Sequence, residues 1–399
     1  MPTYMDVHDI PVEVAFAAPV SDQVLAGHGL PRPVRRSTAG IEIHWDMRDW
    51  SVVVLRRRSG LPWTYGVRAP RSTTHTEGKA PRGGTKPDPA RPADQGDIDQ
   101  MTTRHRFAVV DGLSVFYREA GDPDAPKLLL LGGFPASSHQ FRNLIPALAD
   151  RFHVISPDYP GFGNTDMPDP AGFAYTFDRL SEIVEGLLET IGFTGPMGIY
   201  MEDYGGPVGN RILARHPDWL EWQVIQNSNA YEEGFTAAWD AIRHALWVNR
   251  GPETEAPLEA FLELPGVKLV YTHGHTDAEL ISPDNWIVDA HFLERPNAHR
   301  VQLDLFYDYR TNVELYPVWQ TLLRERQPET LILWGQNDIF FTPEGGEAYL
   351  RDLPEAELIR LDTGHFAVED RLDEIVHAIR RFHAERVAPR AVTGAGAAA

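Results

Sequence analysis

Residues 197–206, Met-Gly-Ile-Tyr-Met-Glu-Asp-Tyr-Gly-Gly, decide the fold of this chain. Their first five residues form a short, largely apolar run, which predicts a buried β-strand. Asp203 follows where that strand must end, and Gly205 and Gly206 come just behind it. Because glycine has no Cβ, it fits the crowded side of a sharp turn from a strand into a helix. The stretch therefore predicts a strand, a tight turn with a carboxylate at its apex, and a helix.

A carboxylate in that position narrows the chemistry. A serine at the same kind of turn attacks a carbonyl carbon. A carboxylate can instead displace a leaving group from a saturated carbon, which leaves an alkyl ester on the protein that water must then cleave. Asp203 therefore predicts a hydrolase that works through a covalent ester.

Length and composition set limits on the rest. The 399 residues allow one large α/β domain with an insertion and an additional segment. The chain contains no cysteine, which excludes disulfides, thiolate metal sites and cysteine nucleophiles. No apolar run approaches the roughly 20 residues of a membrane helix, and the first residues lack the basic flank of a secretory signal. We therefore predict a cytoplasmic protein without a membrane segment.

The net charge of -20 is unevenly distributed along the chain. Residues 1–100 hold 13 Lys and Arg against 12 Asp and Glu, whereas residues 101–399 hold 24 against 45. An acidic domain of this kind repels nucleic acid and anionic membranes. A small, neutral organic substrate, with water as the second reactant, suits it better.

The first hundred residues differ in pattern from the rest. Residues 41–55 contain apolar alternations sufficient for one or two strands, but residues 56–100 are rich in Pro, Gly and charge and show no periodicity. We expect residues 1–100 to be a disordered or irregular extension. Because the regular pattern starts at Met101, our hypothesis is that this extension is a gene-fusion remnant or a misassigned upstream segment.

From Met101 onward, short apolar runs alternate with helical patterns, which favours a mostly parallel sheet covered on both faces. Residues 229–325 interrupt the alternation and predict a helical cap, so the core comprises residues 101–228 and 326–386, followed by a flexible tail over 387–399. The expected strands are 107–110, 115–118, 128–131, 154–156, 197–201, 224–226, 330–334 and 358–361. The expected helices are clearest at 140–149, 180–191, 208–216 and 368–383.

Two further polar residues follow predicted strands. Asp338 comes after strand 330–334 and His365 after strand 358–361. The carboxyl ends of parallel strands meet at one edge of a sheet, and nucleophile, acid and base is the chain order of one known type of catalytic triad. His365 is expected to take a proton from the water that attacks the ester on Asp203. Asp338 is expected to hold His365 in the useful tautomer.

Cleavage of the ester passes through a tetrahedral species that needs donors for its oxyanion. Two backbone N–H groups are placed for this. The first belongs to Tyr204, directly after the nucleophile, and the second to Phe134, in a Gly-Gly-Phe-Pro loop after the strand 128–131.

Five motifs in order now resemble one family. They are Gly-Gly-Phe-Pro at 132–135, Pro-Asp-Tyr-Pro-Gly-Phe-Gly at 157–163, the Asp203 turn, Trp-Gly-Gln-Asn-Asp at 334–338 and Gly-His at 364–365. Over roughly residues 105–385 the chain resembles the epoxide hydrolase and haloalkane dehalogenase branch of the α/β-hydrolase superfamily. The resemblance implies an α/β-hydrolase fold with a mostly parallel central sheet, flanking helices and an inserted helical cap. It also implies hydrolysis through an alkyl-enzyme ester without a cofactor.

The resemblance further implies a partner for the leaving group. Epoxide hydrolases protonate the epoxide oxygen with cap tyrosines, and residues 306–312 resemble the segment that carries one of them, with Tyr309 as the best match. Tyr271 or Tyr231 is expected to be the second.

Dehalogenases instead hold the halide with N–H donors, from a Trp after the nucleophile and an Asn or Trp elsewhere. This chain has Tyr204 and Phe134 at the corresponding positions. We therefore expect an epoxide hydrolase that gives a diol. The alternative substrates are haloalkanes or haloacids.

Two residues depart from the family pattern. Gly132 stands where the family usually has His, and Glu202 stands where His or Gln is common. If Glu202 faced Asp203, the like charges would raise the pKa of one carboxyl group. Because neighbouring residues on a strand alternate between its faces, we expect Glu202 to point away from Asp203.

Three further questions concern the pocket, a metal site and the oligomeric state. The chain could be a non-catalytic α/β-hydrolase scaffold whose cap has closed the pocket. His273, His275 and Asp277 resemble metal ligands, but no further ligand motif lies nearby, so we expect a solvated turn and no metal. The sequence is compatible with a monomer or a homodimer.

Overall fold

The computed structural model describes residues 41–46, 51–56 and 101–390. The chain divides after Asp88 into two compact units. In the first unit, β1 (Ile41–Asp46) and β2 (Ser51–Arg56) pair in antiparallel fashion, so strands occur where apolar alternation predicted them. The expectation of a disordered extension otherwise falls on residues outside the described part of the chain.

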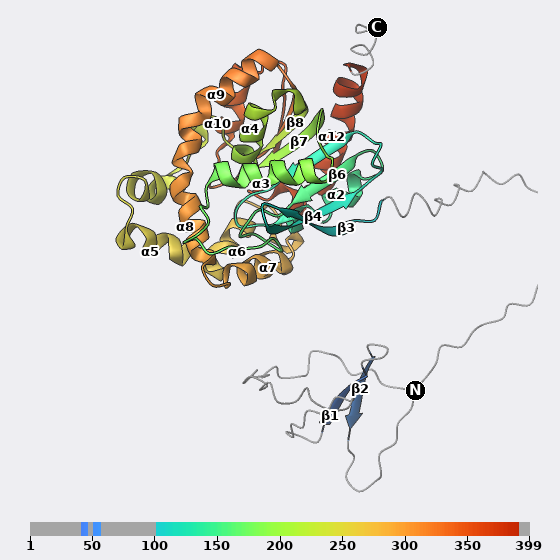
Figure 1. Cartoon of the computed structure of the whole chain (residues 1–399), viewed down its shortest axis with the longest axis vertical. Coiled ribbons are helices and arrows are strands. Elements are labelled where there is room, and N and C mark those ends of the chain that lie inside the picture. Colours follow the sequence, from blue (N-terminus) through green and yellow to red (C-terminus); the bar gives the residue numbers. More distant parts are fainter. Residues whose placement is uncertain (1–40, 47–50, 57–100, 391–399) are drawn as a thin grey trace, which may run out of the picture. The chain divides into compact units, whose positions relative to one another are not determined.

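The second unit contains one eight-stranded sheet in the order β10-β9-β8-β7-β5-β6-β4-β3 (Figure 1). The pairings of β3 with β4 and of β4 with β6 are antiparallel, and the others are parallel. Each of the eight predicted runs lies within one of these strands. The strands are β3 (Arg104–Val110), β4 (Leu113–Ala120), β5 (Lys127–Leu131), β6 (His153–Pro157), β7 (Met197–Glu202), β8 (Leu220–Gln226), β9 (Glu329–Gly335) and β10 (Glu357–Leu361).

Helices cover both faces of this sheet. Leu128 and Leu130 of β5 belong to one apolar cluster with α2 (Leu144–Leu148) and α12 (Leu372–Phe382). The alternate residues of the same strand, Leu129 and Leu131, belong to another cluster with α3 (Phe177–Thr190) and α4 (Gly205–Arg215). Because successive side chains of a strand point to opposite faces, an all-apolar strand requires such a cover on each side.

The segment between β8 and β9, which the sequence marked as a cap, is built from short helices. Figure 1 shows α5 to α8 gathered along one side of the core, at the lower left. Side chains of α8 and α9 share one apolar cluster with α3 and α4, so the cap packs directly on the core. The elements are η4 (Glu232–Gly234), η5 (Ala237–Trp239), η6 (Ala241–Leu246), α5 (Pro252–Phe261), α6 (Leu264–Thr272), η7 (Ala278–Leu280), α7 (Pro283–Leu293), α8 (Ala298–Asp308) and α9 (Arg310–Arg326).

The remaining elements complete the core. They are η2 (Ser138–Phe141), η3 (Pro217–Trp219), α10 (Pro343–Ala348), η8 (Tyr349–Arg351), α11 (Ala367–Asp370) and η9 (His383–Val387). Helical structure continues to residue 390, so the first residues of the expected tail are helical, and residues 391–399 lie outside the described part. Within the described residues, no helix is both long enough and apolar enough to cross a membrane.

Candidate active site

Asp203 lies at a sharp turn between β7 and α4, as predicted. Its φ of 48° is in the left-handed region, which residues with a side chain rarely adopt. A Cβ at Gly205 would lie 2.0 Å from the carbonyl oxygen of Leu131, so that position requires glycine. The Ser228 hydroxyl donates to the carbonyl oxygen of Asp203 at 2.8 Å and holds the turn. The strained backbone thus projects the Asp203 carboxylate beyond the end of the sheet.

The structure brings the three residues of the predicted triad together. Nδ1 of His365 lies 2.7 Å from Oδ2 of Asp338, and Nε2 of His365 lies 4.0 Å from Oδ2 of Asp203. All three residues are buried. Asp338 therefore fixes the imidazole through Nδ1, and Nε2 is turned toward the carboxylate of Asp203.

Asn227, which sequence reasoning missed, supports Asp338. Its side-chain amide donates to Oδ2 of Asp338 at 2.9 Å and accepts from the backbone N–H of Gly335 at 2.8 Å. The backbone N–H of Phe340 donates to the other carboxylate oxygen of Asp338 at 2.7 Å. Asn227 is the first residue after β8, so its place at the carboxyl edge of the sheet was the signal that could have found it.

The two backbone donors expected for the oxyanion also meet Asp203. The N–H of Phe134 donates to Oδ1 of Asp203 at 2.7 Å, and the N–H of Tyr204 is bonded to the same carboxyl group. A Cβ at Gly133 would lie 2.0 Å from Oδ1, so glycine is needed for this approach. Oδ1 therefore accepts from the backbone N–H of Phe134, whereas Oδ2 faces Nε2 of His365 at 4.0 Å.

The expectation that Glu202 points away from the site is wrong. Oε1 of Glu202 lies 3.1 Å from Nε2 of His365, closer than either oxygen of Asp203. The alternation of side chains holds only while the backbone is extended, and Asp203 leaves the extended region at the end of β7. Both carboxylates therefore reach the same histidine.

Burial and mutual charge shift the ionisation of this cluster. Burial raises the pKa of Asp203 to about 6, although the positive charge of His365 opposes the shift. Burial also raises the pKa of Glu202, although the positive charge of His365 opposes this shift as well. Burial alone would lower the pKa of His365, but Asp338, Glu202 and Asp203 outweigh it and raise the value to about 10. The resting site therefore favours an imidazolium among carboxylates.

The raised pKa of Asp203 predicts an acid limit for ester formation. Below a pH of about 6 the carboxyl group gains a proton and loses its nucleophilicity, so the single-turnover rate should fall about tenfold per pH unit. Rapid-quench measurement of ester formation between about pH 4 and 8 tests this expectation. A rate that stays constant down to about pH 4, the ordinary value for Asp, would contradict it.

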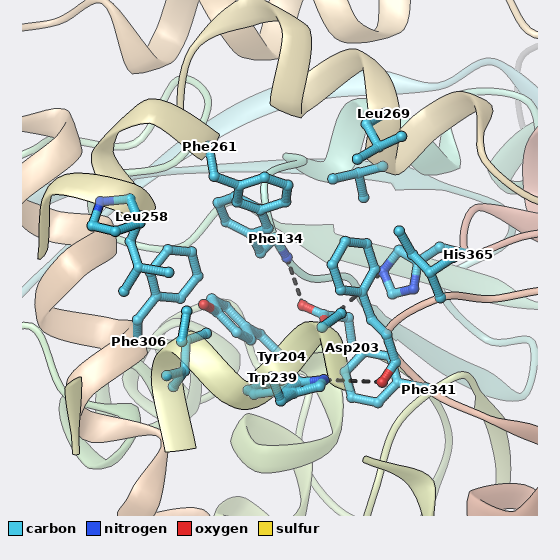
Figure 2. A pocket seen from close by; sticks show the side chains of 17 residues that line it. Phe134, Asp203, Tyr204, Trp239, Leu258, Phe261, Leu269, Phe306, Phe341 and His365 are labelled. Atoms are coloured by element: carbon cyan, nitrogen blue, oxygen red, sulfur yellow. Dashed lines mark hydrogen bonds and ion pairs between the residues drawn. The ribbon is translucent and has the colours of Figure 1, made fainter. Parts of the chain in front are cut away.

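A cavity of about 280 Å³ opens onto Asp203 and His365 (Figure 2). Its walls are aromatic and aliphatic side chains, with Phe134 from the core and Phe261 and Phe306 from the cap. Figure 2 shows Phe134 beside the Asp203 carboxylate, with Phe261 and Phe306 farther along the wall. The cap thus leaves a pocket open at the candidate nucleophile, which contradicts the alternative in which the cap has closed it. The walls suit a small apolar substrate.

Neither cap tyrosine expected as a proton donor lines this cavity. Tyr309 is fully buried, and its hydroxyl interacts with the hydroxyl of Tyr316. The hydroxyl of Tyr271 donates to Asp289 at 2.5 Å, and that of Tyr231 donates to Asp352 at 2.7 Å. Tyr309 lies behind the cavity wall, with its ring centroid 6.1 Å from that of Tyr204 and 4.7 Å from that of Trp239, which both line the cavity.

The reading of residues 273–277 as a solvated turn is wrong for His275. Its side chain is fully buried, with Nδ1 2.9 Å from the Thr363 hydroxyl and 3.1 Å from a carboxylate oxygen of Asp370. The turn packs against the loop that leads to His365, which the sequence pattern could not show. These contacts are structural.

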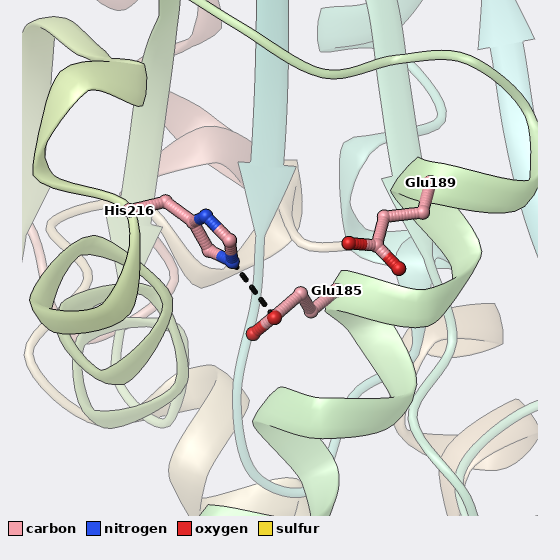
Figure 3. A group of neighbouring side chains, drawn as sticks. All are labelled: Glu185, Glu189 and His216. Atoms are coloured by element: carbon pink, nitrogen blue, oxygen red, sulfur yellow. Dashed lines mark hydrogen bonds and ion pairs between the residues drawn. The ribbon is translucent and has the colours of Figure 1, made fainter.

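Among the described residues, one group of side chains has the composition of a metal site. Glu185, Glu189 and His216 place ligand atoms within 4.8 Å of one another (Figure 3). Glu185 already contacts His216 at 2.8 Å and the guanidinium of Arg215 at 2.5 Å. Arg215 therefore supplies the positive charge that a metal ion would bring, and the contacts of Glu185 with Arg215 and His216 join α3 to the end of α4.

Comparison with known proteins decides the family. The model of the alpha/beta hydrolase fold family matches residues 126–372. The chain belongs to the α/β-hydrolase family. The fold class predicted from the sequence is thereby confirmed, in agreement with the eight-stranded, mostly parallel sheet.

Several relatives of this α/β-hydrolase span most of its core. An uncharacterized hydrolase of Saccharomyces cerevisiae is 39% identical over 284 residues, which cover 70% of this chain and 97% of the relative. A cis-3-alkyl-4-alkyloxetan-2-one decarboxylase of Shewanella oneidensis is 26% identical, covering 71% and 89%. A haloalkane dehalogenase of Bradyrhizobium diazoefficiens is 29% identical, covering 69% and 92%.

Solved structures agree with this fold. The epoxide hydrolase CorEH, solved without ligand, superposes with a TM-score of 0.58 at 20% identity and covers 71% of this chain and 99% of its own. Sequence and structure together identify a hydrolase of the α/β-hydrolase superfamily, with haloalkane dehalogenases and an epoxide hydrolase among the proteins it resembles.

Proposed function

We propose that this α/β-hydrolase cleaves small apolar substrates at a saturated carbon through an alkyl ester on Asp203, and that its substrates are epoxides. One observation carries the proposal: a buried carboxylate nucleophile faces Nε2 of a histidine that Asp338 holds at 2.7 Å. A carboxylate that forms an ester needs a base for the water that cleaves it, and this geometry supplies one.

In the first step, Oδ2 of Asp203 attacks an epoxide carbon, and the carbon–oxygen bond of the ring breaks with its electron pair on oxygen. In the second step, a water molecule gives a proton to Nε2 of His365 while its oxygen bonds to the carboxyl carbon of Asp203. The N–H groups of Phe134 and Tyr204 stabilise the negative charge that develops on Oδ1. The bond between that carbon and the product oxygen then breaks, and the product oxygen takes the proton from Nε2 of His365, which releases the diol. Asp203 returns to its carboxylate form when the second proton of the water leaves it.

Tyr204 is the proton donor that we assign to the epoxide oxygen. Among the residues that line the cavity it is the one tyrosine, and its buried hydroxyl has no hydrogen-bond partner in the described part of the chain. An unpaired buried hydroxyl calls for an explanation. Burial raises the pKa of Tyr204 well above its ordinary value, so it carries its proton at neutral pH. Tyr204 thus takes the role that the sequence assigned to Tyr309 and Tyr271.

The same cavity is less suited to stabilising a halide leaving group. It needs free N–H donors, and the indole N–H of Trp239, which lines the cavity, already donates to the carbonyl oxygen of Phe340 at 2.9 Å. The unpaired hydroxyl of Tyr204 therefore favours an oxygen leaving group over a halide.

Replacing Tyr204 with Phe should slow epoxide ring opening by about 100-fold or more, because the alkoxide would form without an acid. Ester formation on Asp203 in a single turnover is the measurement. The matched control is Tyr309→Phe, which removes a hydroxyl outside the cavity and should change the rate less than about threefold. A larger loss in Tyr309→Phe than in Tyr204→Phe would overturn the assignment.

A substrate panel with product analysis tests the reaction class. An epoxide, a haloalkane and a four-membered lactone of the kind named for the Shewanella relative are each incubated with the protein. We expect a diol from the epoxide. Halide from the haloalkane, or carbon dioxide from the lactone, in the absence of diol formation would overturn the choice of epoxide.

Isotopic water tests the ester itself. Because water attacks the carboxyl carbon, the oxygen that enters the product comes from Asp203, and the oxygen of water stays on the protein. A single turnover in ¹⁸O-labelled water should therefore give unlabelled product and a labelled Asp203. Label in the product of the first turnover would instead mean direct attack by water on the substrate.

A further inference from the structure

The two departures from the family pattern, Gly132 and Glu202, meet in the structure. A Cβ at residue 132 would lie 1.5 Å from the side-chain nitrogen of Gln140, so only glycine leaves room for that amide. The same nitrogen donates to Oε2 of Glu202 at 3.4 Å. Gly132 therefore makes space for the group that holds Glu202.

The other oxygen of Glu202 is directed at the base. Oε1 lies 3.1 Å from Nε2 of His365 and has no other partner among the described residues. Glu202 is almost fully buried, and a buried carboxylate needs compensation. The ion pair with His365 supplies it.

Several titratable groups surround this pair. His365 provides the positive charge, Asp203 and Asp338 add negative charge from the ends of β7 and β9, which lie on either side of β8, and three buried phenols complete the surroundings. The phenols belong to Tyr159, Tyr200 and Tyr271. Burial is the main cause that raises the pKa of each, and the negative charge of Glu202 adds to it. Glu202 thus places a second carboxylate at Nε2 of His365, and the phenols around it cannot replace it as a proton acceptor at neutral pH.

We propose that Glu202 is a positioning residue for cleavage of the ester: acting through His365, it takes up the proton that the resting imidazole carries on Nε2 and leaves Nε2 free to accept a proton from water. The inference rests on the proposed function, because it needs an ester on Asp203. It explains why a carboxylate stands beside the nucleophile despite the repulsion between them.

The protons balance through the cycle. Ester formation neutralises Asp203 and so removes one of the anions that stabilise the imidazolium. The proton then moves from Nε2 to Oε1, and water gives a proton to the vacant Nε2 as it attacks. The product oxygen takes that proton from His365. The second proton of water replaces the one that Tyr204 gave to the epoxide oxygen, so that His365 and Glu202 again share one proton.

The variant Glu202→Gln tests the proposal, since Gln keeps the size and can accept a hydrogen bond but cannot take up a proton. Ester formation should stay within about threefold of the wild type, whereas ester cleavage near pH 6 should slow about 10-fold or more. Intact mass should then show the adduct accumulating on Asp203. The cleavage rate should also rise with pH in the variant and stay nearly flat in the wild type, because the proton on Nε2 must now leave to bulk water.

Two results would overturn the proposal. An unchanged cleavage rate with an unchanged pH profile would mean that Glu202 only fills space. Faster cleavage, with the pH limit moved to lower values, would mean that its charge hinders the base by keeping His365 protonated.

Two further variants provide an independent test and a control. Gln140→Met removes the amide that contacts Glu202 and keeps a side chain of similar volume. The pH profile of ester cleavage should change in the same direction as in Glu202→Gln, but by less. If Glu202→Gln does not fold, an unaltered profile in Gln140→Met overturns the proposal. Glu189→Gln makes the same chemical change at an exposed site on α3 and should match the wild type in both steps.

The variant His365→Gln separates this inference from the proposed function. If it accumulates the adduct while Glu202→Gln turns over as the wild type does, only the role of Glu202 is overturned. If no ester forms on Asp203 in either variant with any substrate of the panel, the proposed function is overturned.

Discussion

Turnover is expected to fall at least ~10⁴-fold when Asp203 is replaced by Asn, because the neutral amide cannot displace a leaving group from a saturated carbon. The loss should appear in kcat with every substrate that the wild type accepts. No covalent adduct should form, even with excess substrate. Steady-state kinetics and intact mass measure the two effects.

Folding is the control for this variant. Asn has nearly the shape of Asp, and its side-chain oxygen can still accept from the N–H of Phe134. The variant also loses a carboxylate whose charged form burial disfavours. The thermal unfolding temperature should therefore be close to that of the wild type. Activity above about 1% in a folded Asp203→Asn protein would exclude Asp203 as the nucleophile.

Replacing His365 with Gln should slow the cleavage of the ester but not its formation. Ester formation continues, because Asp203 and the N–H groups of Phe134 and Tyr204 remain. Cleavage should slow by about 10²- to 10⁴-fold, since Gln cannot take a proton from water. The protein should then gain the mass of one substrate molecule, located by peptide mapping on Asp203.

The double variant Asp203→Asn with His365→Gln is the matched control, and it should gain no mass. An adduct on any other residue in this double variant would point to adventitious alkylation. Rapid turnover by His365→Gln alone would show that another group acts as the base.

The fold was predictable because its signals are local. The apolar run Leu128–Leu131 and the glycines behind Asp203 each specify their own backbone, whatever the rest of the chain does. Asp338 and His365 could be found because parallel strands bring their carboxyl ends to one edge, so that chain order predicts proximity.

The rest of the site depends on packing, which periodicity does not resolve. The side chain of Glu202 turns toward His365 because Asp203 breaks the extended backbone at φ 48°, and no pattern of residue types reports that angle. The hydroxyls of Tyr309 and Tyr271 are kept from the cavity by how the cap helices pack. The role of Gln140 could not be predicted either, because its contact with Glu202 joins residues that lie 62 positions apart in the sequence.

The apolar cavity also bears on how the reaction ends. In the reaction that we propose, the diol carries hydroxyl groups that the epoxide lacked, and most of the cavity wall offers them no hydrogen-bond partner. Each hydroxyl left unpaired in such surroundings costs about 1 to 3 kcal/mol, which corresponds to roughly 5- to 150-fold weaker binding. Affinity therefore declines as the chemistry proceeds, and the product should be a poor inhibitor of the protein that makes it. The apolar walls therefore favour both the binding of the substrate and the release of the product.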